Sequence, residues 1–104
     1  MELKSANEMQ WRSIRDGVSF SPLRMTKLGA GSFLIKLKAG SRSDAHTHPA
    51  GEELYVIEGS GKLDDLNFKT GDFVYTPPNE GHTVYADTDV TLLICLPEPV
   101  VSLE

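Results

Sequence analysis

At 104 residues the chain is long enough to bury a hydrophobic core without disulfides or a structural metal, and we expect one domain over residues 1–104. The formal net charge of −5 and the lack of a basic cluster argue against a nucleic-acid partner, and no apolar stretch reaches the ~18 residues of a membrane span. The single cysteine, Cys95, rules out an internal disulfide and, with an N-terminus that lacks the apolar core of a signal peptide, predicts a cytoplasmic protein.

Strand-like segments follow one another along the chain, and Gly, Pro and Asp separate them. Before Met25 the pattern is ambiguous, because residues 7–15 fit either a helical turn or an extended arm. Farther on, the apolar pattern predicts strands at residues 32–37, 52–58, 62–68 (a hairpin that turns near Asp64), 73–76, 82–86 and 90–96. Short strands with frequent turns are typical of an all-β sandwich or barrel.

Two of these segments, residues 54–57 and 92–96, are apolar on both faces. A strand with one face in water should alternate, whereas a strand covered on both faces need not. We therefore expect a second cover, which is either the N-terminal part of the chain or another subunit. The second alternative predicts a homodimer.

The three histidines of the chain are His46, His48 and His82. Side chains at i and i+2 of a strand share a face, so His46 and His48 can converge on one point. Glu52 has the same parity and can join them if the short break before it turns the chain back. Three imidazoles and a carboxylate suit a divalent transition metal, whereas calcium prefers oxygen donors throughout. A lone histidine is more often a surface or core residue, but this combination favours a metal site.

The spacing of these residues resembles the two motifs of the cupin superfamily. The first motif covers residues 40–59 and reads Gly40, His46, His48, Glu52 and Gly59. The second motif covers residues 71–86 and reads Gly71, Pro77 and His82. The resemblance implies an all-β, cupin-type double-stranded β-helix (a jelly-roll barrel) in which the three histidines and Glu52 hold one metal ion.

The second motif departs from the cupin pattern at two positions. Asn79 stands where the motif has a turn glycine, and asparagine tolerates the left-handed region better than most residues. Ala86 stands where the motif has asparagine, so a polar side chain is missing there. Neither change removes a ligand. The motif spacing selects Glu52 as the ligand, because three residues separate it from His48 and six separate it from Gly59. Glu53 has the opposite parity and would point away.

Within the superfamily the chain looks closest to the cupin-like domain of zinc-binding anti-sigma factors and to acetylacetone dioxygenases. The residues behind this placement are the run 9–18, the stretch 48–53 and the pair Pro77-Pro78. The anti-sigma factors carry a separate helical segment that grips the sigma factor, and this chain has no room for one. The resemblance therefore implies the barrel and the metal site, but not sigma-factor binding.

Two functions fit such a site. The first is a metal-dependent, dioxygenase-like enzyme for a small oxygen-bearing molecule, and the alternative is a non-catalytic sensor or accessory module that binds metal or a small ligand. The donor set is compatible with Fe, Mn, Ni, Zn, Cu or Co and does not choose among them. It leaves positions open at a five- or six-coordinate metal and none at a tetrahedral one. The sequence identifies no general base; Tyr75, Tyr85 and Glu80 are candidate rim residues for which a structural or solvated role is the simpler interpretation.

Overall fold

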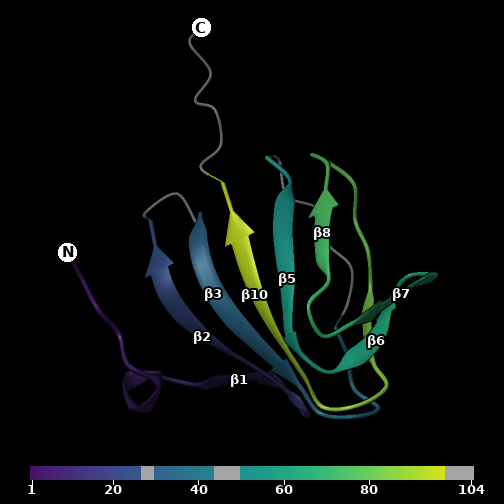
Figure 1. The fold of residues 1–104 in the computed structure, drawn as a ribbon, viewed down its shortest axis with the longest axis horizontal. Coiled ribbons are helices and arrows are strands. Elements are labelled where there is room, and N and C mark those ends of the chain that lie inside the picture. Colours follow the sequence, from purple (N-terminus) through teal and green to yellow (C-terminus); the bar gives the residue numbers. More distant parts are fainter. Residues whose placement is uncertain (27–29, 44–49, 98–104) are drawn as a thin grey trace, which may run out of the picture.

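The computed structural model describes residues 1–26, 30–43 and 50–97, and within these ranges the fold is all-β apart from one short 3-10 turn (Figure 1). The elements in chain order are η1 (Ala6–Glu8), β1 (Arg12–Arg15), β2 (Val18–Met25), β3 (Gly31–Leu37), β4 (Arg42–Ser43), β5 (Glu52–Glu58), β6 (Ser60–Leu63), β7 (Leu66–Lys69), β8 (Phe73–Thr76), β9 (Val84–Ala86) and β10 (Val90–Leu96). The expectation of an all-β chain is confirmed.

The described strands form two antiparallel sheets. The larger sheet has the order β1-β2-β3-β10-β5-β8, and the smaller one has the order β4-β9-β6-β7. Figure 1 shows the long strands β2, β3, β10 and β5 side by side, with β6 and β7 beside the end of this sheet. Side chains from both sheets form one core, which includes Leu54, Val56 and Leu92 from the larger sheet and Leu63 and Phe68 from the smaller.

Strand β5 alternates between the core and the outer face of the larger sheet from Glu52 to Ile57. Leu54 and Val56 are 1% and 0% exposed, whereas Tyr55 and Ile57 are 45% and 43% exposed. The described N-terminal segment therefore leaves the outer face of β5 accessible to solvent. The sequence predicts that either the N-terminal part of the chain or another subunit covers this face. The described N-terminal part does not cover Tyr55 and Ile57.

The N-terminal part contains both alternatives that the sequence leaves open. One 3-10 turn, η1, precedes β1, and β1 pairs with β2. The sequence analysis does not predict β2 as a strand. The pairing of β2 with β3 shifts register between Pro22 and Arg24, and such a bulge breaks the alternation by which a strand is recognised.

The remaining strands match the prediction, with small differences at their ends. The hairpin of β6 and β7 turns at Asp64 and Asp65, between the paired residues Leu63 and Leu66. Strand β9 begins at Val84, so His82 lies in the loop before it and not within the strand. The two-residue strand β4 is too short to leave a sequence pattern.

Candidate metal centre

The structure describes two of the four predicted metal ligands, Glu52 and His82. The other two, His46 and His48, lie outside the described residues. Their metal ligation stays a prediction. The geometry of the centre is therefore built from the first two side chains and their neighbours.

Glu52 is the first residue of β5 and points to the interior. It is 6% exposed and pairs in register with Thr76 at the end of β8, whereas its neighbour Glu53 is exposed. The chain approaches β8 closely at Gly51, directly before the strand. A Cβ atom on Gly51, whose φ is +83°, would lie only 2.7 Å from the carbonyl oxygen of Thr76. Glycine is the residue that adopts this φ without strain and leaves room for the contact.

The imidazole of His82 lies between two groups of the larger sheet. Its Nε2 atom is 3.3 Å from Oε1 of Glu52, and its Nδ1 atom is 3.4 Å from the hydroxyl oxygen of Thr76. The side chains of His82 and Glu52 are 16% and 8% exposed. One ring nitrogen thus faces a buried carboxylate while the other contacts a hydroxyl that can orient the ring.

The turn before His82 has the conformation that the sequence indicates. Asn79 has φ +65°, in the left-handed region, and the backbone N–H of Glu80 donates to the carbonyl of Pro77 over 3.3 Å. Asparagine therefore occupies a position where the cupin motif has glycine. Ala86, where the motif has asparagine, is 0% exposed and packs in the core.

A second loop contacts the chain directly after His82. The backbone N–H and the hydroxyl of Thr83 both donate to Oδ1 of Asp64, over 2.9 and 3.0 Å, and the backbone N–H of Asp64 donates to the carbonyl of Thr83 over 3.0 Å. The Thr83 backbone N–H, then its hydroxyl, and the nearby His82 hold the pKa of Asp64 below its ordinary value of 3.8 against a small opposing effect of desolvation.

Neither Thr76 nor Asp64 is marked by the sequence as a neighbour of the predicted ligands. Register could have pointed to Thr76, since it pairs with Glu52 across β5 and β8. No sequence signal brings Asp64 to Thr83, 19 residues farther on. Such a contact depends on the way in which two loops meet in space.

The three candidate rim residues do not reach this centre from the described strands. Tyr75 neighbours Thr76 on β8 but has the opposite parity and is 56% exposed on the outer face. Tyr85 is 41% exposed between the buried residues of β9, and Glu80 is exposed in the turn. The structural or solvated role favoured by the sequence fits these positions.

The chemistry of the described pair fits a transition-metal cation. A buried carboxylate is costly to desolvate unless a positive charge or hydrogen bonds compensate it. An imidazole nitrogen beside it adds a donor that borderline metal ions favour. Among residues 1–26, 30–43 and 50–97, no group of three or more His, Cys, Asp or Glu side chains is placed to hold a metal. Two donors alone do not complete a site, and the residues predicted to complete it are the two histidines outside these ranges.

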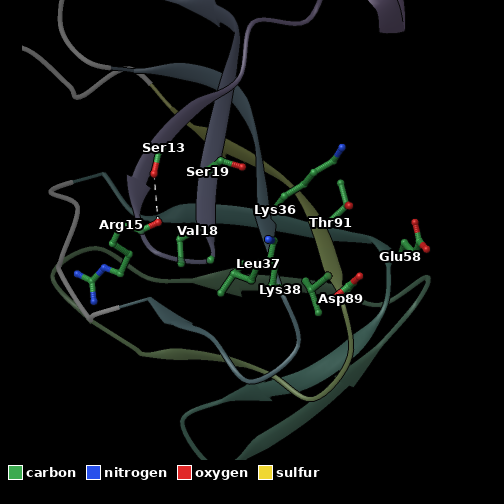
Figure 2. A pocket seen from close by; sticks show the side chains of 12 residues that line it. Ser13, Arg15, Val18, Ser19, Lys36, Leu37, Lys38, Glu58, Asp89 and Thr91 are labelled. Atoms are coloured by element: carbon green, nitrogen blue, oxygen red, sulfur yellow. Dashed lines mark hydrogen bonds between the residues drawn. The ribbon is translucent and has the colours of Figure 1, made fainter.

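A separate pocket of about 490 Å³ lies at the far end of β5 (Figure 2). Its lining includes Lys36, Thr91 and Glu58, which are cross-strand neighbours on β3, β10 and β5. Glu58 is six residues from Glu52, or roughly 20 Å along a strand. In Figure 2 the side chains of Arg15 and Lys36 extend in different directions, so they do not converge on one ligand. The pocket is not part of the candidate metal centre.

Comparison with protein families gives a match to the ChrR cupin-like domain over residues 1–99. A curated relative is the DNA damage-repair/toleration protein DRT102 of Arabidopsis thaliana, with 32% identity over 87 residues. That match covers 78% of this chain and 27% of the plant protein, so the chain spans about a quarter of its relative's length.

Solved structures with the same architecture include a regulator and a candidate enzyme. One is the anti-sigma factor ChrR of Rhodobacter sphaeroides in complex with SigE, with a TM-score of 0.75 and 22% identity; the match covers 89% of this chain and 51% of that chain. Another is a candidate acetylacetone dioxygenase of Methylibium petroleiphilum PM1, with a TM-score of 0.81 and 15% identity; the match covers 92% and 76% of the two chains. At these identities the likeness establishes the fold.

Within the part of the chain that the structure describes, no helix is long and apolar enough to cross a bilayer.

Proposed function

Because the chain belongs to the family of ChrR cupin-like domains, we propose that it binds one divalent transition metal per chain. The cupin resemblance inferred from the two sequence motifs is confirmed, as is the cupin-type fold. The residues proposed to hold the metal are His46, His48, Glu52 and His82.

The observation that carries the proposal is the contact between Glu52 and His82. In the neutral tautomer that carries its proton on Nδ1, the imidazole can donate to the Thr76 hydroxyl, 3.4 Å away, and presents a lone pair at Nε2. That lone pair would face the carboxylate oxygen over 3.3 Å in a largely buried environment. Two electron-rich atoms at this distance repel unless a proton or a cation lies near both. A divalent metal bound by both removes the repulsion and compensates the buried charge.

The favoured activity is that of a dioxygenase-like enzyme for a small oxygen-bearing molecule. When bound, the metal would act as a Lewis acid and as a template that holds an enol or carboxylate group of the substrate. The carboxylate of Glu52 would neutralise one of the two positive charges of a divalent ion, and the remaining charge would attract one further anionic ligand. The structural likeness to a candidate acetylacetone dioxygenase supports this class of substrate.

A non-catalytic sensor or accessory module is the second candidate. It is favoured by the family match and by the likeness to ChrR, an anti-sigma factor solved together with SigE. The two functions differ at the metal, because a module can use a closed four-coordinate site whereas an oxygenase needs an exchangeable position.

Elemental analysis of protein purified without added metal tests the site, and an oxygen electrode tests the activity. The enzyme is expected to take up dioxygen with reduced iron and a 1,3-diketone, and His82→Ala is expected to abolish the uptake without unfolding the barrel. The absence of any bound metal would refute the site. A closed four-coordinate zinc and no uptake with iron, manganese, nickel or copper would favour the module.

We further propose that the protein is a cytoplasmic homodimer that pairs through the outer face of β5 and β8. Tyr55, Ile57, Phe73 and Tyr75 on this face are between 43% and 60% exposed, and Tyr55 pairs directly with Phe73. A fully exposed aromatic side chain offers roughly 200 Å². The three aromatic side chains therefore expose about 320 Å², and Ile57 adds to this area, against the ~800 Å² that each partner contributes to a standard interface.

The dimer is tested by sedimentation velocity at micromolar concentration. Phe73→Glu is expected to give monomers, because it places a charge within the apolar interface. Leu66→Glu, at a side chain that is 67% exposed on the other sheet, is the control and should leave the dimer intact. A wild-type mass near 11.4 kDa would refute the dimer.

A further inference from the structure

We propose that Asp64 is a positioning residue for His82, and that its carboxylate sets the metal affinity by holding the backbone that carries this ligand. The inference rests on the proposed role of His82 as a metal ligand. It assigns a function to a side chain on the β6–β7 turn that neither sequence motif includes.

The geometry consists of a closed set of hydrogen bonds between two loops. Thr83 directly follows His82, and both its backbone N–H and its hydroxyl donate to the same carboxylate oxygen of Asp64. The carbonyl of Thr83 accepts from the backbone N–H of Asp64. Both backbone polar groups of Thr83 are thus held in hydrogen bonds. They restrain the Cα atom of His82, which lies about 3.8 Å from that of Thr83 across one peptide unit.

Strand pairing alone does not supply this restraint. Leu63 and Val84 form the last paired positions of β6 and β9, and the chains continue from there to Asp64 and Thr83. Asp64 has φ +51° and begins the two-residue turn, so its backbone leaves the sheet. In a regular antiparallel ladder the backbone N–H of Thr83 would donate to the backbone carbonyl of Asp64. Here the side chain of Asp64 provides the acceptor for the N–H of Thr83.

The imidazole is itself restrained by Thr76, through the 3.4 Å contact at Nδ1. The two contacts act on different parts of the residue, since Thr76 orients the ring while Asp64 fixes the backbone. A metal ligand needs both, because a site tolerates displacements of only about 0.5 Å. Loss of an outer-shell partner typically lowers metal affinity by about 10–100-fold.

The test compares variants of Asp64 that separate the turn from the acceptor. Asp64→Gly keeps a residue suited to positive φ and removes the carboxylate, whereas Asp64→Asn keeps both the turn preference and an oxygen acceptor. Thr83→Val removes the hydroxyl donor alone. Asp65→Asn changes the other turn residue, for which no side-chain hydrogen bond is described, and is the matched control.

Two measurements are made on each variant. Titration with Co²⁺ gives the dissociation constant, and the visible spectrum of the bound ion reports its coordination geometry. In the metal-free protein, long-range ¹H–¹⁵N spectra at a pH where the imidazole is neutral report the two ring nitrogens of His82, one of three histidines in the chain.

Asp64→Gly is expected to weaken Co²⁺ binding about 10–100-fold and to change the visible spectrum. It should also bring the two His82 nitrogen shifts closer together, because a mobile backbone lets the ring leave Thr76 and both neutral tautomers become populated. Thr83→Val should show the same changes to a smaller degree, whereas Asp64→Asn restores most of the affinity and Asp65→Asn matches the wild type. Should Asp64→Gly fail to fold, Thr83→Val decides in its place.

Wild-type affinity, spectrum and His82 shifts in both Asp64→Gly and Thr83→Val would overturn the proposal. A wild-type protein that binds no Co²⁺ would instead refute the metal site. In that case the His82 shifts of the metal-free variants still decide whether Asp64 positions the ring.

Discussion

Replacing Glu52 by glutamine should abolish most of the stabilisation that metal binding gives to the fold, whereas the same change at Glu53 should have no effect. Glutamine keeps the size of the side chain and removes the charge. Glu52 is 6% exposed and its carboxylate lies 3.3 Å from His82, whereas Glu53 is on the exposed face of the same strand. The pair of variants therefore tests the register of β5 at the metal.

The magnitude follows from binding linkage. Zinc at a free concentration of 100 times the wild-type Kd stabilises the folded state by about 2.7 kcal/mol. Outer-shell changes already cost about 10–100-fold in affinity, so loss of the only anionic ligand should cost at least ~100-fold. At the same zinc concentration the Glu52→Gln protein would then gain at most about 0.4 kcal/mol.

The assay is thermal unfolding of metal-free protein with and without zinc, followed by circular dichroism. With about 4–8 °C per kcal/mol for a domain of this size, wild-type protein and Glu53→Gln should gain roughly 10–20 °C, and Glu52→Gln at most about 3 °C. The difference between the two conditions cancels the effect of each substitution on the metal-free fold. If Glu53→Gln loses the gain while Glu52→Gln keeps it, the assignment of Glu52 as the ligand is wrong.

Three further predictions concern the fold around the centre. Leu54→Ala, at a side chain 1% exposed, should lower the free energy of unfolding in urea by about 2–5 kcal/mol, whereas Leu66→Ala, 67% exposed, should change it by no more than about 0.5 kcal/mol. Gly51→Ala should destabilise the protein by at least about 1–2 kcal/mol in the same assay. The φ of Gly51 is +83°, and the added Cβ would lie 2.7 Å from the carbonyl oxygen of Thr76. Wild-type stability of the variant would contradict this packing. The folded-state pKa of Asp64 is lowered, so its contribution to stability is present above pH 3.8 and is lost as the pH falls through the folded-state value. The Asp64→Asn protein should therefore lose less free energy of unfolding than wild-type protein between pH 7 and pH 3. Equal losses of stability in the two proteins would refute the effect.

The sequence was most informative where a pattern is local. Glu52 and Glu53 are adjacent, and strand parity alone indicates that one points inward and the other outward, as found. Asn79 stands at a turn position that needs positive φ, and its observed φ of +65° follows from the tolerance of asparagine for that region. The strands β5, β8 and β10 were predicted with their observed bounds, because each contains a short apolar run and has Gly or Pro close to at least one end.

Other features depend on how distant segments meet. Strand β2 was not predicted, because a bulge between Pro22 and Arg24 breaks the alternation of its side chains between the two faces of the sheet. The outer face of β5 is apolar in sequence, but only the packed fold shows that Tyr55 and Ile57 remain exposed. Both findings come from the arrangement of neighbouring strands, which no local pattern contains.

By itself, the sequence determined the all-β class, the cupin resemblance and the identity of the predicted ligands, because strand period, turn residues and donor chemistry are properties of short segments. The tertiary structure alone decided which groups lie beside the two predicted ligands that it describes, Glu52 and His82. Thr76 lies beside Glu52 through the pairing of β5 with β8, and Asp64 reaches Thr83 across 19 residues through the meeting of two loops. Such contacts arise when packing of the core brings distant backbone segments together, and their hydrogen-bonding partners are then chosen by distance in space and not along the chain.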